Sequence, residues 1–141
     1  MVISEVYSNL TTNTRSPQSN RREQKRMGPL RSDKRPWGIW EEYLNERNYR
    51  VKRLMIDPGK RLSLQKHPPR SEFWVVVQGE GIVILNEEQR NVSIGDTVFI
   101  RREAVHRLQN KGSAPLIVIE TQFGVCLEED VVRLADDWGR T

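Results

Sequence analysis

The chain has 141 residues, a net charge of +4 and a mean hydropathy of −0.68. It is long enough for one domain of ordinary size plus a tail, and it has no apolar run near the ~20 residues that a membrane-spanning helix needs. Its start has no basic region leading into a long apolar stretch, so we expect no secretory signal. Because the single cysteine, Cys126, cannot form an internal disulfide, we expect a cytoplasmic protein in which this thiol is inert packing.

The first 35 residues differ from the rest in charge. They hold eight Lys and Arg against three Asp and Glu, a balance of +5, whereas residues 36–141 hold 15 against 16, a balance of −1. The segment is polar and poor in large apolar side chains, which predicts a disordered basic tail at 1–35 followed by a folded domain at 36–141. This tail is either a solubilising leader or an arm that binds an acidic protein. It lacks aromatic residues between its basic ones, which argues against nucleic acid as the partner.

Short apolar runs separated by turn residues fill the rest of the chain. Runs rich in β-branched and aromatic residues predict eight strands, at residues 49–56, 61–65, 73–78, 81–85, 92–94, 97–101, 106–110 and 115–123. Turn residues such as Asp57-Pro58-Gly59 stand between them. Eight strands at this spacing predict an all-β fold, a jelly-roll sandwich or barrel with antiparallel pairing.

Two segments have a helical character. Residues 128–139, EEDVVRLADDWG, predict a short C-terminal helix that ends at Gly139. Residues 40–46, WEEYLNE, fit a helical turn or a strand equally well.

Several large apolar residues are expected in the core. Trp37, Trp40 and Trp74 predict packing in the core or at its rim, since aromatic residues carry much of a small β-core. The three consecutive valines at 75–77 predict a strand that is covered on both faces, either at the centre of a sandwich or in a contact between two copies of the chain. A two-fold homodimer is the commonest oligomer, so we expect a homodimer.

Polar residues embedded in the predicted strands form a candidate metal site. In RLSLQKH, alternation with period two puts Gln65 and His67 on one face. Glu72 begins the next strand after a Pro-Pro corner, and the only other histidine, His106, opens a later strand. Two imidazoles, a carboxylate and an amide oxygen suit one divalent ion such as Zn²⁺, Fe²⁺, Mn²⁺, Co²⁺ or Ni²⁺. The alternative is that each is an ordinary polar strand residue that faces solvent.

The spacing of these residues resembles the two cupin motifs. Gly59, Gln65, His67, Glu72 and Gly79 follow the first motif, with glutamine in place of its first histidine. The second motif is matched by Gly95, His106 and Asn110, although Arg101 and Glu103 replace its proline and glycine.

A closer resemblance is to the cupin domain of type II phosphomannose isomerases. It is carried by RPWGIWEEY, YRVKRLMIDPGKRLSLQKH, EFWVVVQGEG, AVHRLQN, PLIVIETQFG and EEDVVRLADDWGR, so it runs from about Pro36 to Arg140. In that family the domain is commonly the C-terminal half of a bifunctional enzyme with mannose-1-phosphate guanylyltransferase. A Gly-rich nucleotide-binding signature is missing from this sequence, so the guanylyltransferase activity is not carried over.

The resemblance implies roles for particular residues. The family's metal ligands correspond to Gln65, His67, Glu72 and His106, and its arginine before the glutamate corresponds to Arg70. It therefore implies a metal-dependent isomerase that interconverts mannose 6-phosphate and fructose 6-phosphate. Arg70 and Glu72 are the candidate catalytic residues, because the reaction needs an electrophile for the developing oxyanion and a general base.

The sequence departs from the family next to this set. Pro68, Pro69 and Phe73 stand where the family usually has histidine, which removes three imidazoles that could move protons or orient a sugar. Basic residues near the site are candidates for the substrate's phosphate, with Arg61, Lys66 and Arg102 selected from a pool that also contains Lys52, Arg53 and Lys60.

Three functions are therefore open. The first is the sugar-phosphate isomerase. The second is a cupin with a decayed catalytic site that serves as a binding or assembly module through its basic N-terminal arm. The third is other metal chemistry, since His67, Glu72 and His106 also form the two-histidine, one-carboxylate set of iron oxygenases.

Overall fold

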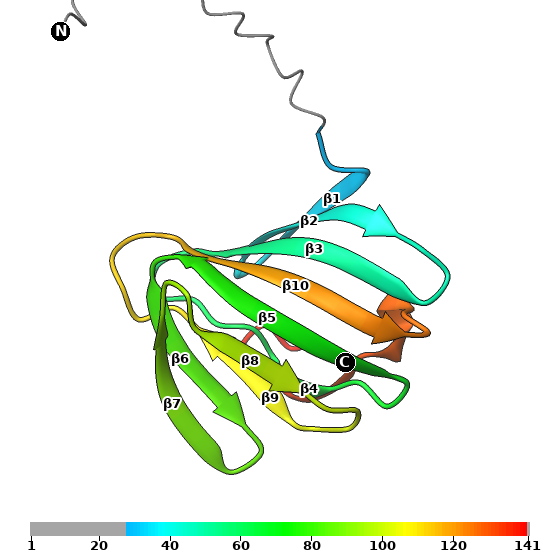
Figure 1. Cartoon of the computed structure of the whole chain (residues 1–141). Helices are drawn as coiled ribbons and strands as arrows, with labels where there is room; N and C mark the ends of the chain where they lie inside the picture. The colour runs from blue at the N-terminus through cyan, green and yellow to red at the C-terminus, as the bar shows by residue number, and fades with distance from the viewer. Residues whose placement is uncertain (1–27, 141) are drawn as a thin grey trace, which may run out of the picture.

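The chain folds into two antiparallel β-sheets that pack face to face, as Figure 1 shows for residues 28–140, the part that the computed structural model describes. The strands are β1 (Arg31–Arg35), β2 (Gly38–Asn45), β3 (Tyr49–Ile56), β4 (Leu64–Lys66), β5 (Arg70–Gln78), β6 (Glu80–Leu85), β7 (Glu88–Ser93), β8 (Thr97–Ile100), β9 (His106–Gln109), β10 (Leu116–Gly124) and β11 (Val132–Ala135). A single 3₁₀ turn, η1 (Glu128–Asp130), precedes the last strand. The large sheet has the order β1-β2-β3-β10-β5-β8 and the small sheet the order β11-β4-β9-β6-β7. The predicted all-β jelly roll is confirmed.

Alternation along the strands places the core between the sheets. In β5, Glu72, Trp74 and Val76 face inward and are buried, while Phe73 and Val75 face outward. The same pattern in β10 buries Leu116, Val118, Glu120 and Gln122. Trp37, Trp40 and Trp74 belong to the buried cluster, as expected. The inner face of the large sheet is therefore apolar at one end and polar at the other, and the polar end carries the candidate site.

The predicted C-terminal helix over 128–139 is wrong. Only η1 is helical, and β11 pairs with β4 through Val132↔Lys66 and Arg133↔Gln65. Strand β4 has a free edge on the side away from β9, so an extended partner satisfies its backbone groups, and the two β-branched residues before Arg133 favour that conformation. Gly139 does adopt a left-handed φ of 67°, but it closes a turn from Asp136 and not a helix.

The beginning of the folded part also differs from the expectation. Residues 31–35, assigned to the polar tail, form β1 and pair along their whole length with β2. The ambiguous segment 40–46 lies almost entirely in β2, so its strand reading is the correct one. The expected disorder of residues 1–27 concerns a part of the chain outside the described residues.

No helix in residues 28–140 has the length and apolar composition needed to cross a bilayer.

Two glycines with nearly the same backbone conformation give a test of the fold. Gly59 and Gly79 have φ of 75° and 79°. A Cβ at Gly59 would meet nothing within 4 Å, whereas one at Gly79 would lie 2.7 Å from the carbonyl oxygen of Pro115. We expect Gly59→Ala to cost about 1–2 kcal/mol of unfolding free energy, from the left-handed φ alone. Gly79→Ala should cost at least twice as much in the same urea titration, and equal losses would contradict the close approach of Gly79 to Pro115.

Candidate metal centre

Three buried side chains from both sheets meet at the polar end of the core. Glu72 extends from β5 of the large sheet, His67 directly follows β4, and His106 opens β9 of the small sheet. Gln65 and His106 are direct partners in the β4–β9 ladder, which brings the two predicted motifs together. The exposed fractions of His67, Glu72 and His106 are 2%, 1% and 0%. The alternative of solvent-facing polar residues is therefore excluded for these three.

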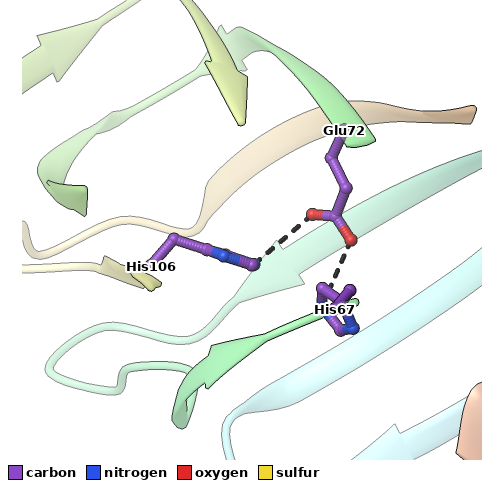
Figure 2. A group of neighbouring side chains, drawn as sticks. All are labelled: His67, Glu72 and His106. Carbon is purple, nitrogen blue, oxygen red and sulfur yellow. Dashed lines mark ion pairs between the residues drawn. The ribbon is translucent and has the colours of Figure 1, made fainter. Parts of the chain in front are cut away.

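The Glu72 carboxylate lies between the two imidazoles (Figure 2). Its Oε1 is 3.2 Å from His67 Nε2, and its Oε2 is 3.6 Å from His106 Nε2. One ligand atom from each residue can be chosen so that all three lie within 4.8 Å of one another. Zinc-type bonds of about 2.0–2.2 Å set neighbouring ligand atoms roughly 3.0–3.5 Å apart. The two distances from the Glu72 carboxylate are close to this range, and the wider limit of 4.8 Å means that the side chains would draw together around an ion.

Three atoms of this group are buried and have no hydrogen-bond partner: His67 Nδ1, Glu72 Oε2 and His106 Nε2. The last two are 3.6 Å apart. His106 Nδ1 lies 2.9 Å from the carbonyl oxygen of Ala104, an acceptor only, so Nδ1 carries the proton and Nε2 presents its lone pair. Two bare acceptors that face each other in a dry interior cost about 1–3 kcal/mol each. A divalent cation between them satisfies both, so these residues fit a metal ion.

The protonation of the imidazoles suits the same role. Burial, followed by the positive charge of Arg70, lowers the pKa of His67 to about 2. Burial likewise lowers the pKa of His106. Both rings are therefore neutral near pH 7, which is the state in which histidine binds a metal.

The fourth predicted ligand, Gln65, is close but differently oriented. Its Oε1 accepts a hydrogen bond from Ser63 Oγ at 2.7 Å, and its Nε2 lies 3.3 Å from His67 Nε2. The amide nitrogen is thus the atom that faces the site. Gln65 would have to rotate its amide group to present the oxygen, so its role as a ligand stays a prediction.

Arg70 is buried against two of the candidate ligands, His67 and Glu72. Its Nε donates to Glu72 Oε1 at 3.0 Å, its Nη2 lies 3.2 Å from His67 Nε2, and its Nη1 donates to the carbonyl oxygen of Leu127 at 3.3 Å. One guanidinium thereby fixes the orientation of two ligands. The pKa of Glu72 is raised well above its usual value by burial and by the neighbouring Glu120, and Arg70 opposes that rise.

A second row of polar residues on the inner face of the large sheet, centred on Glu120 and Gln122, was not identified from the sequence. Trp74 Nε1 donates to Glu120 Oε2 at 2.9 Å, and Gln122 Nε2 donates to Glu120 Oε1 at 2.6 Å. Lys52 is the cross-strand neighbour of Glu120, and its Nζ lies 4.3 Å from the centre of the Trp40 ring. The alternation that buries Leu116 and Val118 also turns Glu120 and Gln122 inward, so the pattern of the strand at 115–123 held this signal.

A pocket opens onto His67 and Arg70. The basic side chains in its wall are Arg35, Lys52, Arg70, Arg133 and Arg140, and Glu120 is the carboxylate in it. Its other lining residues are Trp37, Trp40, Leu54, Leu62, Ser63, Gln65, His67, Gln122 and Val131. Basic side chains outnumber carboxylates in this wall, although Arg35, Arg70 and Arg140 form ion pairs with Asp33, Glu72 and Asp136. This excess of positive charge favours an anionic ligand.

The three predicted phosphate-binding residues do not line this pocket. Arg61 forms a bidentate ion pair with Asp137, with both N–O distances 2.8 Å, and Lys66 pairs with Val132 in the β4–β11 ladder. Arg102 is exposed in the turn that precedes β9. Their assignment to the substrate stays a prediction, and the lining favours other cations.

The positions that depart from the family differ in their distance from the site. Phe73 faces outward from β5 and pairs with Phe99 of β8, so a histidine at 73 would point away from the metal centre. Pro68 is exposed in the turn before β5, and Pro69 is half-buried. Of the three positions where the family usually has histidine, only Pro68 and Pro69 can therefore lie near the pocket.

The fold and site together are those of a cupin, a class of double-stranded β-helix proteins that typically bind a metal ion. The chain matches the family "Mannose-6-phosphate isomerase C-terminal" over residues 21–137, and it belongs to that family.

Relatives with known names are longer proteins. The chain is 42% identical over 107 residues to mannose-1-phosphate guanylyltransferase ManC of Salmonella typhimurium, a match that covers 75% of this chain and 22% of that protein. It is 41% identical over 108 residues to xanthan biosynthesis protein XanB of Xanthomonas campestris, covering 76% of this chain and 23% of that protein. The chain thus spans less than a quarter of the length of these relatives.

Solved structures agree on the fold. One is an oxalate decarboxylase–formate complex of Lactobacillus farciminis, at 23% identity and a TM-score of 0.66, covering 74% of this chain and 33% of that one. Another is a Klebsiella pneumoniae protein with a double-stranded β-helix domain, at 19% identity and a TM-score of 0.61, covering 69% of this chain and 83% of that one.

Proposed function

We propose that this protein is a metal-dependent sugar-phosphate isomerase that interconverts mannose 6-phosphate and fructose 6-phosphate in the cytoplasm. The observation that carries the proposal is the pair of bare, buried acceptor atoms on Glu72 and His106, placed beside a pocket whose wall is rich in positive charge. The first feature calls for a cation and the second for an anionic ligand. Membership of the mannose-6-phosphate isomerase C-terminal family supports the choice of reaction.

In this proposal, separate residues bind the metal ion and stabilise the substrate. Glu72, His67 and His106 hold the ion, with Gln65 as the proposed fourth ligand. When bound, the ion supplies a positive charge that polarises the sugar oxygens during proton transfer between C1 and C2. Arg70 keeps His67 and Glu72 in place and brings a fixed guanidinium to the pocket floor, where negative charge develops on the substrate.

The pocket wall accounts for substrate binding. Arg133 and Arg140 lie in the C-terminal segment, opposite Lys52 and Glu120 of the large sheet, and all four line the pocket. The basic side chains suit the phosphate, while the carboxylate of Glu120 suits sugar hydroxyls. Glu72 does not line this pocket, so its proposed part in catalysis is exerted through the ion.

The experiment is a coupled assay of mannose 6-phosphate isomerisation. Purified protein is stripped with a chelator and reloaded separately with Zn²⁺, Fe²⁺, Mn²⁺, Co²⁺ and Ni²⁺. We expect turnover to disappear on stripping and to return with at least one of these metals, in proportion to the bound metal. Glu72→Gln, which keeps the shape of the side chain, should remain inactive under every condition. A fully loaded wild-type protein without turnover would refute the isomerase proposal.

The Pro68-Pro69 turn favours one alternative, a binding module with a decayed site. In that case sugar phosphates would bind to the metal-loaded protein without being converted, which calorimetry separates from the outcome above. The same three ligands also allow an Fe²⁺ oxygenase, which would consume oxygen with a co-substrate and leave mannose 6-phosphate unchanged.

A further inference from the structure

The pocket beside the metal centre is smaller than the ligand proposed for it. Its cavity volume is about 80 Å³, which is room for roughly five to eight water molecules. Sites that enclose a small organic ligand measure roughly 300–1,000 Å³. A sugar phosphate can therefore be enclosed only if part of the wall moves.

The wall of this pocket has three parts. The large sheet supplies Lys52 and Glu120 from β3 and β10, strands that are paired with a neighbour on each side. The segment around β4 supplies Ser63 and His67, whose side chains are buried. The third part lies on residues 131–140, which we call the C-terminal strap, and consists of Val131, Arg133 and Arg140.

The C-terminal strap is the part of the wall with the weakest attachment. Its strand β11 is at the edge of the small sheet and pairs with β4 over a short ladder whose register shifts between Arg133 and Ala135. Beyond the ladder, Arg107 Nη2 donates to the carbonyl oxygen of Ala135 at 3.1 Å, and Arg61 Nε lies 2.8 Å from Asp137 Oδ2. The side chains of Arg61 and Asp137 are 37% and 41% exposed, so water screens this ion pair.

The strap is internally connected and has one apolar anchor. Asp136 accepts hydrogen bonds from the backbone N–H of Arg140 at 2.8 Å and from its Nη2 at 2.7 Å. Trp138 is half-buried against the core, which favours the closed position. Before the strap, the carbonyl oxygen of Leu127 accepts a hydrogen bond from Arg70 Nη1, so the chain is held at that point. The strap can therefore turn as one piece about the residues that follow Leu127.

The charge of the strap favours closure on an anion. Arg133 is the ladder partner of Gln65, and both line the pocket together with Arg140. Lys52 lines the same pocket from the large sheet. A phosphate group between them would be bound by cations of both the strap and the sheet, and a guanidinium can bind it through two parallel hydrogen bonds.

We propose that residues 131–140 are a movable strap that parts from β4 to admit a sugar phosphate and then closes on its phosphate group through Arg133. Arg133 thereby selects phosphorylated sugars over free ones. The identity of the ligand rests on the proposed function, whereas the opening of the strap is a property of the chain alone.

Hydrogen exchange of the full chain without ligand tests the opening. We expect the backbone amides of β11 to exchange at least about 100-fold faster than those of β10, because a segment that opens locally exchanges without global unfolding. Asp137→Asn removes the exposed ion pair and should speed the exchange of β11 about two- to fivefold, with β10 unchanged. Equal protection of β11 and β10 overturns the proposal.

A disulfide across the β4–β11 ladder tests whether opening admits the ligand. Lys66 and Val132 are direct antiparallel partners and do not line the pocket. Their Cα atoms are therefore about 4.5–5.5 Å apart, within the range that a disulfide spans. The chain with Lys66→Cys and Val132→Cys should bind mannose 6-phosphate at least about 30-fold more slowly when oxidised than when reduced, because the locked strap cannot open. Inorganic phosphate fits the closed pocket, so its binding rate should change less than about threefold.

The fluorescence of Trp37 and Trp40, which line the pocket, follows binding in these experiments. The matched control is a crosslink in the β6–β7 hairpin, made with Ile84→Cys and Gln89→Cys, and its oxidation should change neither rate. A separate variant, Arg133→Gln, should weaken binding of mannose 6-phosphate about tenfold.

The outcomes separate the strap from the proposed function. An oxidised chain that binds mannose 6-phosphate as fast as the reduced one overturns the strap, and unchanged affinity in Arg133→Gln overturns the role of that residue. Binding that the crosslink blocks, but that leads to no turnover in the reduced chain, refutes the isomerase and supports the strap.

Discussion

Replacing His106 with alanine is expected to abolish stoichiometric metal binding. The side chain is fully buried, its Nδ1 is fixed by the carbonyl oxygen of Ala104, and its Nε2 is one of the two bare acceptors. Without it only Glu72 and His67 remain as ligands, because Gln65 turns its amide nitrogen and not its oxygen toward the site. Changing a residue that merely supports a ligand costs 10–100-fold in affinity, so losing the ligand itself should cost more than about 100-fold. Elemental analysis and a chelator competition titration measure this.

Two further variants make the result specific. Gln65→Ala should lose less affinity than His106→Ala, because its amide nitrogen faces the site and its oxygen is held by Ser63. His106→Gln fills most of the space of the imidazole and separates loss of a ligand from loss of packing, with circular dichroism reporting the fold. Full metal content at unchanged affinity in His106→Ala would show that the site is assigned to the wrong residues.

The second large effect is expected from Arg70→Lys. Lysine keeps the charge but cannot reach Glu72, His67 and the Leu127 carbonyl at once, as the guanidinium does. We expect kcat/KM for mannose 6-phosphate to fall about 100-fold at saturating metal, with metal affinity reduced only about tenfold, as for other residues that orient a ligand. On the proposed function, Arg70 supplies a preorganised positive group to the substrate, and losing such a group has an effect of this size.

A conservative change far from the site controls for this experiment. Arg47 is exposed between β2 and β3, and Arg47→Lys should leave both the rate and the metal affinity within about twofold of the wild type. If metal-loaded Arg70→Lys turns over substrate at the wild-type rate, Arg70 has only a structural role.

The local patterns predicted most of the strands and the centre of the site. Runs rich in β-branched and aromatic residues, bounded by turn residues, identify β3, β5, β6, β8, β9 and β10. The spacing of His67, Glu72 and His106 brought together residues that the structure places within one small cluster. Asn110, singled out by the second motif, is buried and bonds to the carbonyl oxygens of Ile56 and Ala114.

Two edge strands, β1 and β11, escaped prediction for a physical reason. β1 is held by its backbone ladder to β2, and its RSDKR sequence is largely exposed, so it shows no hydrophobic pattern. Arg35 lines the pocket, but it was not predicted as a site residue because it belongs to this unpredicted strand. The segment that forms β11 was predicted as a helix because the spacing of its apolar residues fits one. It is a strand because it pairs with the free edge of β4, a contact that the local sequence does not reveal.

The selection of phosphate-binding residues shows a different limit. Strand alternation indicates which face a side chain occupies, but it does not show which charges are already paired. Arg61 and Asp137 are 76 positions apart in the sequence, so local sequence patterns do not predict their ion pair.

The substitution at Glu103 shows how the second motif tolerates change. Glu103 stands where that motif has glycine, and its φ of 63° is still left-handed. Its backbone N–H donates to the carbonyl oxygen of His67 at 3.2 Å, so this turn connects the two halves of the site. The strain of a non-glycine residue, about 1–2 kcal/mol, is thus accepted beside the metal centre.

The three candidate ligands come from opposite sheets, with Glu72 on the large one and His67 and His106 on the small one. An ion held by all three would link the two sheets at the polar end of the sandwich, so the sheets could not separate there without releasing it. Removing the ion would take away this link and leave two buried acceptors facing each other between the layers. The two layers should therefore be held together less firmly at this end in the metal-free protein than in the loaded one.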